Sequence, residues 1–309
     1  MAAEIAVVMP VYNRQELVKR TLQSIADQET LPGHLILVDN NSSDSTPDVL
    51  TDWAYANNGK RGMRVSVLKE TTPGAAAARN AGLAHVTEPW VMHFDSDDAM
   101  LPSHISRVAA AIAAHPRAHI IGWDVKEVSL GGTAKILPFE PTDCIYHCVM
   151  HGMMASQRYA ARTSLLSAAG GWDPDMRIWN DVELGLRMLL ALPQSAEIAK
   201  VSGTPAVVVY CQQESITGTA FSLRAPEIEN AIAAMEHTLP PHSRWMTRLR
   251  SSILAGHYRR EGRQDLARAL QHRTLAAEPS ARRRLLLRLA HAYTSAGGRG
   301  AARLLRPLF

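Results

Sequence analysis

The stretch "EIAVVMPVYNRQELVKRTLQSI", residues 4–25, shows how the chain is built. Residues 4–12 form an apolar run that ends in a polar cluster, which predicts a buried strand. Leu17, Leu22 and Ile25 then recur at helical spacing, which predicts a helix over residues 14–27. A strand followed at once by a helix is the repeating unit of α/β proteins.

The same alternation continues to about residue 115. Further strands are predicted at 34–40, 64–70 and 90–95, with helices from about 46, 75 and 102. Strands alternating with helices predict a doubly wound, mainly parallel sheet. Beyond residue 120 we expect strands within 119–130, 131–139 and 204–212, and helices near 163–170 and 181–192.

The C-terminal part differs in composition and in charge. From residue 224 the pattern is almost wholly helical, and 237–243 is the most linker-like stretch. Residues 244–309 hold 15 Arg, no Lys and three acids, a net charge of +12, which leaves −8 for the rest of a chain whose total is +4. We therefore predict an α/β domain over 1–225 and a basic helical appendage over 240–309.

Several classes of protein are disfavoured by the sequence. Three cysteines give no even framework for disulfides, which fits a reducing compartment. The start of the chain lacks a basic segment followed by a long apolar one, and no apolar run approaches the roughly 18 residues of a membrane span. We expect a cytoplasmic protein that can attach to the inner face of the cell membrane.

Acidic residues follow two of the predicted strands. Asp39 ends the second strand, and Asp95, Asp97 and Asp98 follow the fourth. In open parallel sheets ligands bind beyond the carboxyl ends of the strands, so these carboxylates are expected at one edge. With no obvious Arg or Lys partner nearby, they favour an oxygen-ligated Mg²⁺ or Mn²⁺ ion. The alternative is that Asp97 and Asp98 cap the helix that begins near Pro102.

Five blocks in order carry a family resemblance. They are "AVVMPVYNRQELVKRTLQSI", "LILVDNNSSDST", "PGAAAARNAGL", "FDSDD" and "GGWDPDMRIWNDVELGLRML". Together they resemble family 2 of the glycosyltransferases, which are inverting enzymes of the GT-A fold that use nucleotide sugars. The resemblance covers about residues 4–220, and the ordered set is far more specific than any single block. It implies that the domain over 1–225 is catalytic, with a nucleotide-sugar half to about 100 and an acceptor half after it.

The resemblance implies which residues bind the nucleotide. The base pocket would be lined by the end of the first strand and its turn, at Pro10, Val11, Tyr12 and Asn13. Asp39 would contact the uracil or its surroundings. Many family members carry a second acid at the next position, where this chain has Asn40.

The resemblance also assigns residues to the diphosphate and its metal. Gly74 and Arg79 would lie near the base and the diphosphate, although Arg79 could instead pair with one of the aspartates. In the D-x-D motif of Asp95, Ser96 and Asp97, Asp95 would face the ribose and the metal, and Asp97 would bind the metal directly. Mn²⁺ or Mg²⁺ is the implied cofactor.

The last block would supply the catalytic base. By resemblance Asp181 accepts the proton of the attacking hydroxyl, and Asn180 stands where the family commonly has Glu. The alternative for Asp181 is an acid that stabilises a helix N-terminus. Trp179 would offer a flat apolar face to a sugar ring, or would simply pack.

Asp98, Cys211 and Gln213 remain to be assigned. Asp98 would orient its loop or cap the following helix. Cys211 and Gln213 stand where many members have Arg and His, and Gln213 could coordinate the metal only weakly.

The resulting hypothesis is an inverting transferase that moves a sugar from a UDP-sugar to a hydroxyl of a glycan or lipid-linked saccharide in a bacterial cell envelope. Residues 281–293, a basic amphipathic helix, would touch an anionic membrane or pack on the catalytic domain. The alternatives are a non-catalytic glycosyltransferase-like binding protein, or a sugar nucleotidyltransferase. The second usually has a Gly-rich loop after strand one, where this chain has "PVYNRQE". Nucleic acid is not an expected partner, because no aromatic platform accompanies the arginines.

Overall fold

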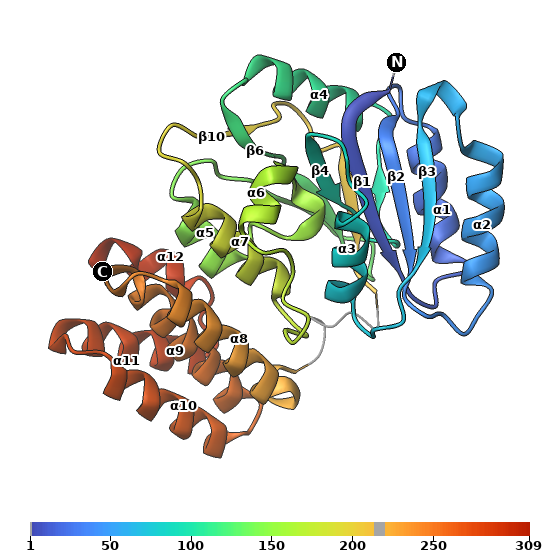
Figure 1. The fold of residues 1–309 in the computed structure, drawn as a ribbon. Coiled ribbons are helices and arrows are strands. Elements are labelled where there is room, and N and C mark those ends of the chain that lie inside the picture. Colours follow the sequence, from blue (N-terminus) through green and yellow to red (C-terminus); the bar gives the residue numbers. More distant parts are fainter. Residues whose placement is uncertain (1, 213–219) are drawn as a thin grey trace. The chain divides into compact units, whose positions relative to one another are not determined.

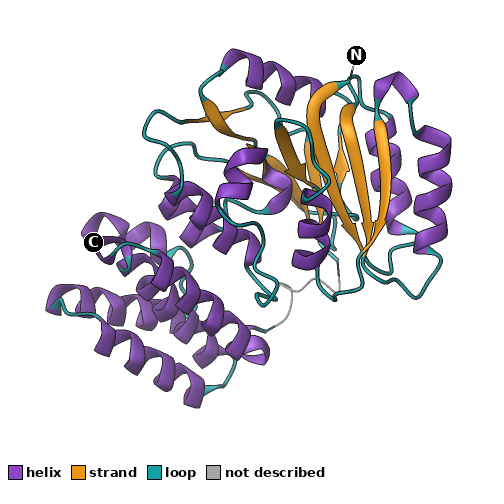
Figure 2. Cartoon of the chain, viewed as in Figure 1, coloured by secondary structure: helices purple, strands orange, loops and turns teal. Residues whose placement is uncertain are grey.

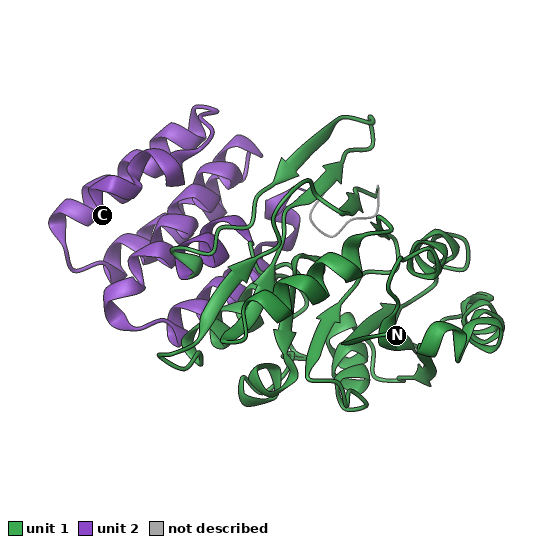
Figure 3. Ribbon diagram, turned by 90° about the horizontal axis from the view of Figure 1, so that it is seen from above, with its two compact units in different colours: residues 1–144, 153–213 green, residues 145–152, 214–309 purple. Residues whose placement is uncertain are grey.

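The computed structural model describes residues 2–212 and 220–309. The chain forms two compact units, shown in Figure 3. Unit 1 consists of residues 1–144 and 153–213, and unit 2 of residues 145–152 and 214–309. Each unit is described by itself.

A seven-stranded sheet forms the centre of unit 1 (Figure 1). All neighbouring strands pair in parallel except β9, which is antiparallel to both of its neighbours. In spatial order the strands are β10 (Glu197–Lys200), β6 (Ala118–Gly122), β9 (Tyr159–Arg162), β4 (Trp90–His93), β1 (Ala3–Val11), β2 (Pro32–Asp39) and β3 (Arg64–Lys69). The predicted α/β class with a mainly parallel sheet is confirmed.

A second, smaller sheet shares no strand pairing with the first. Its order is β5 (Ala99–Met100), β11 (Val207–Tyr210), β7 (Val125–Val128) and β8 (Ala134–Leu137). The predicted strand over 119–130 is thus two strands, β6 and β7, in different sheets. The predicted strand over 90–95 ends at His93, so the acids that follow it lie in a loop.

Helices cover both faces of the large sheet (Figure 2). They are α1 (Leu17–Ala26), α2 (Thr46–Asn57), α3 (Ala75–Leu83), α4 (His104–Ala114), α6 (Thr163–Ala168) and α7 (Asn180–Leu190). Successive side chains of a strand point to opposite faces. On β1, Val7 and Met9 lie in a cluster with α1 and α4, whereas Val8 faces α3. The alternation of β1 therefore separates α3 from α1 and α4.

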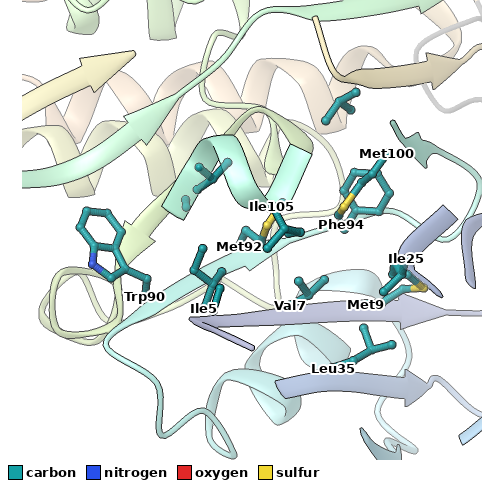
Figure 4. Close-up of a cluster of buried hydrophobic side chains, with 14 of the residues drawn as sticks. Ile5, Val7, Met9, Ile25, Leu35, Trp90, Met92, Phe94, Met100 and Ile105 are labelled. Atoms are coloured by element: carbon teal, nitrogen blue, oxygen red, sulfur yellow. The ribbon is translucent and has the colours of Figure 1, made fainter. Parts of the chain in front are cut away.

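The main core lies between the large sheet and helices α1 and α4 (Figure 4). It includes Ile5, Met92 and Phe94, all essentially inaccessible to water. Burial of a side chain of this size stabilises the fold by about 1.5–3 kcal/mol. The apolar run seen in the sequence of β1 is buried on both faces, as expected for a central parallel strand.

One glycine fixes how closely α3 approaches the sheet. A Cβ on Gly82 would lie 2.4 Å from Cγ1 of Val8 and 3.1 Å from Cγ2 of Val38. Only a residue without a side chain lets the helix sit this near β1 and β2. This close packing brings α3, with Arg79 in its middle, to the carboxyl edge of the sheet.

Unit 2 is a helical bundle. Its helices are α8 (Ala225–Thr238), α9 (Trp245–Arg260), α10 (Gln264–Ala277), α11 (Ala281–Ser295) and α12 (Ala301–Leu305). Its core holds Leu249 of α9, Leu287 and Ala290 of α11, and Ala302 of α12. The predicted all-helical C-terminal region is confirmed. Among the described helices, none is both long enough and apolar enough to cross a bilayer.

The units divide the chain differently from the predicted domain boundaries. Most of α5 (Cys144–His151) groups with unit 2, although we expected it within the catalytic domain. Tyr146 stacks on Trp245, and the guanidinium of Arg250 donates to the carbonyl of Val149. These contacts with α9 explain the grouping. The linker expected at 237–243 lies between α8 and α9, inside unit 2.

Candidate functional site

The loop after β4 is held in place by helix α1. The hydroxyl of Thr21 lies 2.9 Å from the carbonyl oxygen of Ser96 and 2.7 Å from that of Asp98. The guanidinium of Arg20 donates to the carbonyl of Asp97. Helix α1 thus fixes the backbone of all three residues and leaves the carboxylates of Asp97 and Asp98 to other partners. The sequence patterns gave no indication of Arg20 or Thr21.

Asp98 ties this loop to the small sheet. It is buried, and its Oδ1 accepts a hydrogen bond of 3.0 Å from the backbone nitrogen of Tyr210, in β11. Burial raises its pKa well above the usual range, and the nearby charges of Asp95 and Asp97 add to the effect. Of the two predicted roles the structure shows the orientation of the loop. Helix capping is not observed, since Ser103 is the residue that precedes α4.

Asp97 is only half-buried, and its surroundings disfavour its negative charge. Burial raises its pKa, and the repulsion from Asp95 raises it further. Arg14 and Arg20 oppose this shift only in part. The loop therefore concentrates more negative charge than its neighbours neutralise.

Asp95 does have a cationic partner, contrary to the premise drawn from the sequence. Nη2 of Arg79 lies 2.8 Å from its Oδ1, and the hydroxyl of Ser156 lies 3.3 Å from the same oxygen. The Arg79 side chain is 9% exposed, whereas that of Asp95 is 31% exposed. The alternative reading of Arg79, an ion pair within the protein, is thus the one that the structure shows. The cause is the close packing of α3 on the sheet at Gly82, which the spacing of the motifs did not reveal.

A buried aromatic group supports Arg79. Its guanidinium lies 4.4 Å from the ring centroid of Trp172, a cation–π contact. The indole nitrogen of Trp172 donates in turn to Nε2 of His93, at 3.2 Å. Burial lowers the pKa of His93 to about 3, with a further contribution from the charge of Arg79. His93 is therefore neutral and can accept this bond.

The third and fifth sequence blocks meet at Asn80. Its side chain donates to the carbonyl of Trp172 at 2.7 Å and accepts from the amide of the same residue at 2.8 Å. Gly171 has φ +71°, and a Cβ there would lie 2.8 Å from Oδ1 of Asn80. The "RN" and "GGW" motifs thus contact each other. We call this contact of Asn80 with Gly171 and Trp172 the clamp, and it holds the indole against the guanidinium of Arg79.

Asp181 belongs to the same electrostatic group. It lies in the first turn of α7, half-buried, and its Oδ1 accepts from the amide of Val182 at 2.9 Å. Burial raises its pKa, the charge of Arg79 lowers it, and the charge of Asp95 raises it. Asp181 thus lies where the charges of Asp95 and Arg79 act on it, and its role as base stays a prediction. The helix-terminal position of the alternative reading is also present.

The neighbours of Asp181 have mainly structural contacts. Asn180 donates to the carbonyl of Met176 at 3.3 Å, and it starts α7. Trp179 is half-buried and has the left-handed backbone conformation, with φ +53°. Gln213 lies outside the described residues.

The end of β1 and the end of β2 are tied by polar bonds. Asn13 has φ +49°, its Oδ1 accepts from the amide of Ser43 at 2.8 Å, and its own amide donates to the hydroxyl of Ser42 at 3.0 Å. The buried carboxylate of Asp39 accepts from the amide of Ser42. Tyr12 beside them is 57% exposed, so its ring is open to a ligand.

Pro10 and Val11 hold this turn in register with the neighbouring strand. They lie opposite Val38 and Asp39 in the parallel ladder of β1 and β2. Their place at the carboxyl edge of the sheet is the one that the family resemblance implied.

Asn40 explains its own departure from the family pattern. Its amide nitrogen donates to the carbonyls of Glu70 and Thr72, and its Oδ1 accepts from the amide of Gly74 at 2.8 Å. An amide can both donate and accept, whereas a carboxylate could only accept. Asn40 thus shapes the loop in which Gly74, with φ +122°, precedes α3.

The residues present fit a hard cation only in part. Within residues 2–212 and 220–309 no group of three or more His, Cys, Asp or Glu side chains could hold a metal ion. The two half-exposed carboxylates, Asp95 and Asp97, supply oxygen donors of the kind that Mg²⁺ and Mn²⁺ prefer. Such ions are often held by one or two carboxylates plus water and substrate phosphates, and this donor set agrees with that pattern.

Comparisons with other sequences match part of the chain to a known family. The sequence model of the family "Glycosyl transferase family 2" matches residues 6–133. An uncharacterized glycosyltransferase of Haemophilus influenzae is 25% identical over 190 residues, 60% of this chain and 62% of the relative. A PGL/p-HBAD biosynthesis glycosyltransferase of Mycobacterium tuberculosis is 30% identical over 121 residues, 39% of this chain and 46% of the relative.

A third relative is the amylovoran biosynthesis glycosyltransferase AmsB of Erwinia amylovora, 29% identical over 143 residues, 44% of this chain and 46% of the relative. The chain spans about half to three fifths of the length of these relatives.

Solved structures show the fold. The crystal structure of residues 1–349 of S. aureus TarS has a TM-score of 0.62 at 15% identity, and covers 100% of this chain and 92% of TarS 1–349. Its complex with UDP-GlcNAc has a TM-score of 0.68 at 17% identity, over 99% and 92% of the two chains. The resemblance seen in the sequence is thus confirmed for residues 6–133, which match the model of glycosyl transferase family 2, and the chain has the GT-A fold of the TarS structures.

Proposed function

We propose that this protein is an inverting glycosyltransferase that moves a sugar from a UDP-sugar to a hydroxyl of a glycan or lipid-linked saccharide. The observation that carries the proposal is the group formed by Asp181, Asp95 and Arg79, with Asp97 beside it. It unites a half-exposed acid that can act as base with acids that can hold a cation. The relatives named for PGL/p-HBAD and amylovoran biosynthesis, and the TarS complexes with UDP and UDP-GlcNAc, support this class of donor and acceptor.

The donor would bind along the carboxyl edge of the sheet. Tyr12, Asn13 and Asp39 would surround the base, with Gly74 beside them. Asp95 and Asp97 would hold a Mg²⁺ or Mn²⁺ ion together with the diphosphate. That ion would offset the negative charge that develops on the departing diphosphate.

Asp181 would accept the proton of the attacking hydroxyl. A base works best when its pKa lies near the working pH, and burial moves the pKa of Asp181 upward. The amide of Val182 fixes the orientation of the carboxylate through Oδ1. Arg79 limits the shift, so the carboxylate can stay ionised until the hydroxyl arrives.

The test is UDP release from UDP-sugars with Mn²⁺, together with a separate measurement of UDP binding. Asp181→Asn should lower turnover by about 10²–10⁴-fold, the usual contribution of a general base. UDP binding should persist in this variant. Asp175→Asn, at an exposed acid of the same segment, is the matched control and should behave as the unchanged protein.

Three results would contradict the proposal. Equal turnover in Asp181→Asn and Asp175→Asn would remove Asp181 from the chemistry. UDP binding without any turnover on a broad donor and acceptor screen would favour the non-catalytic alternative. Release of pyrophosphate from a nucleoside triphosphate and a sugar phosphate would favour a nucleotidyltransferase.

A further inference from the structure

Helix α11 of unit 2 exposes a continuous apolar stripe. Leu285, Leu289 and Tyr293 are 56%, 48% and 42% exposed. They follow one another at intervals of four residues, so they fall within an arc of about 80° on the helix. The opposite face of α11 carries Leu287 and Ala290, which are fully buried in the core of the unit. The stripe is therefore a second apolar face, distinct from the one that holds the fold together.

Arginines lie beside and within the stripe. With about 100° per residue, Arg288 lies about 60° to one side of Leu285, and Arg282, about 60° to the other side, falls within the arc of the stripe one turn before Leu285. Both residues are exposed. Within the described residues Arg288 makes no ion pair. The segment from 281 to 309 holds seven Arg, no Lys and no acid, so no acid of this segment neutralises the surface.

The C-terminal turn adds to the same surface. The guanidinium of Arg282 donates to the carbonyl of Leu308 at 3.0 Å, which places this turn beside the start of α11. Leu308 is 45% exposed. Leu308 thus adds a further exposed apolar residue near the start of α11, beside Arg282.

We propose that the face of Leu285, Leu289 and Tyr293, with Arg282 and Arg288, binds an anionic lipid surface. Apolar side chains with arginines beside and among them match the interface of a membrane. The apolar side chains enter the boundary of the acyl chains, and the arginines contact the anionic headgroups. A second copy of this chain fits less well, because pairing two such faces would bring arginines against arginines. A nucleic acid would need the arginines but gain nothing from the leucines. This inference does not depend on the proposed function.

The experiment is co-sedimentation of the full chain with vesicles, at low and high salt. Vesicles of phosphatidylcholine with phosphatidylglycerol should bind the protein, and phosphatidylcholine alone should bind it much less. Leu285→Ser with Leu289→Ser should weaken binding at least about tenfold, because two apolar side chains no longer enter the lipid. Arg288→Glu should weaken it at least about fivefold, and added salt should have a similar effect.

Matched controls lie elsewhere on unit 2. Leu223→Ser changes a leucine of the turn Phe221–Arg224 that is 75% exposed, and Arg268→Glu changes an exposed arginine of α10. Both controls should bind vesicles as the unchanged protein does. All substituted side chains are exposed, so thermal unfolding should confirm that each variant is folded.

Four outcomes would overturn the proposal. The first is equal binding to neutral and anionic vesicles, and the second is equal loss in the stripe variants and their controls. The third is a dimer in solution that the stripe variants dissociate, which would assign the face to a second copy. Loss in Arg288→Glu without loss in the leucine variants would point to a polyanion in place of a membrane.

Discussion

Each unit holds an arginine against a carboxylate, and the two pairs differ in how far water reaches the acid. In unit 2, Glu278 is 0% exposed and its Oε2 lies 2.9 Å from Nη1 of Arg248, while its Oε1 accepts from the amide of Ser280. In unit 1, the side chain of Asp95 is 31% exposed although Arg79 is buried. Protein covers the acid of the first pair completely, and we call this pair closed. The second leaves its acid open to a ligand.

The exposure of the acid can therefore be used to separate structural from functional ion pairs in this chain. A closed pair has all its hydrogen-bonding capacity occupied, so its removal should affect stability. An open pair keeps an oxygen accessible, so its removal should affect ligand binding more than stability. The predictions below test this contrast in order of expected effect on the free energy of unfolding.

The closed pair should give the largest loss of stability. Glu278→Gln leaves the cation of Arg248 with one partner, Glu236 at 3.0 Å. Breaking a buried pair costs about 3–5 kcal/mol, and we expect about 3 because Glu236 remains. Denaturant unfolding measures the change, with Asp265→Asn in the exposed pair with Arg263 as the control, which should change stability little. Equal losses in both variants would erase the contrast.

The clamp under the open pair should come next. Gly171→Ala forces a left-handed backbone on a residue with a Cβ and pushes that atom toward Asn80, which should cost about 2 kcal/mol. Gly131→Ala, at a site with open space, is the control. Donor binding should weaken with Gly171→Ala because Trp172 then shifts beneath Arg79. Unchanged stability would show that the clamp yields without strain.

The open pair itself should contribute less to stability. Asp95→Asn removes the charge opposite Arg79, yet Ser156 and the indole of Trp172 still contact the guanidinium. We expect about 1 kcal/mol of lost stability, the size of a typical hydrogen bond. UDP release should fall far more, by about 100-fold, because the variant loses a charge at the donor site. A stability loss as large as that of Glu278→Gln would make this pair structural.

The smallest effect concerns Asp181 and should be a gain. Its pKa is raised in the folded state, so this carboxyl favours folding below its unfolded pKa, and that stability is lost as pH rises through the folded pKa. Asp181→Asn removes this loss, so the variant should be slightly more stable than the unchanged protein at neutral pH. The advantage should vanish at low pH, where both side chains are neutral. Thermal unfolding across pH checks it, and a loss at neutral pH would mean that the charge stabilises the fold.

Much of the fold could be predicted because it follows from local pattern. The apolar runs of β1 and β2, each followed by a helical pattern, lead directly to a parallel sheet. That topology in turn places Asp39 and Asp95 at one edge. Strand β9 was missed because "YAAR", residues 159–162, is short and carries no alternation. Its position between β4 and β6 is set by pairing across more than 35 residues, which no local pattern encodes.

The polar contacts of the site were harder to predict than its acids. The ion pair of Arg79 with Asp95 depends on how closely a helix approaches a sheet, and the sequence does not give that distance. The roles of Arg20 and Thr21 were missed for a similar reason, since both act through backbone carbonyls of another segment. Asn80 and Trp172 were both in recognised blocks, yet only the fold shows that the blocks touch.

The anchoring of the loop after β4 limits what can be changed there. Residues 94–98 are bound from one side by α1, through Thr21, and from the other by β11, through the bond between Asp98 and Tyr210. A segment this short, held by contacts on both sides, has no spare length to accommodate an added residue. An insertion of even one residue between Phe94 and Asp98 would either detach the small sheet or turn Asp97 away from Asp95. For anyone who redesigns donor choice, the identities of these side chains can be varied, but the spacing between them cannot.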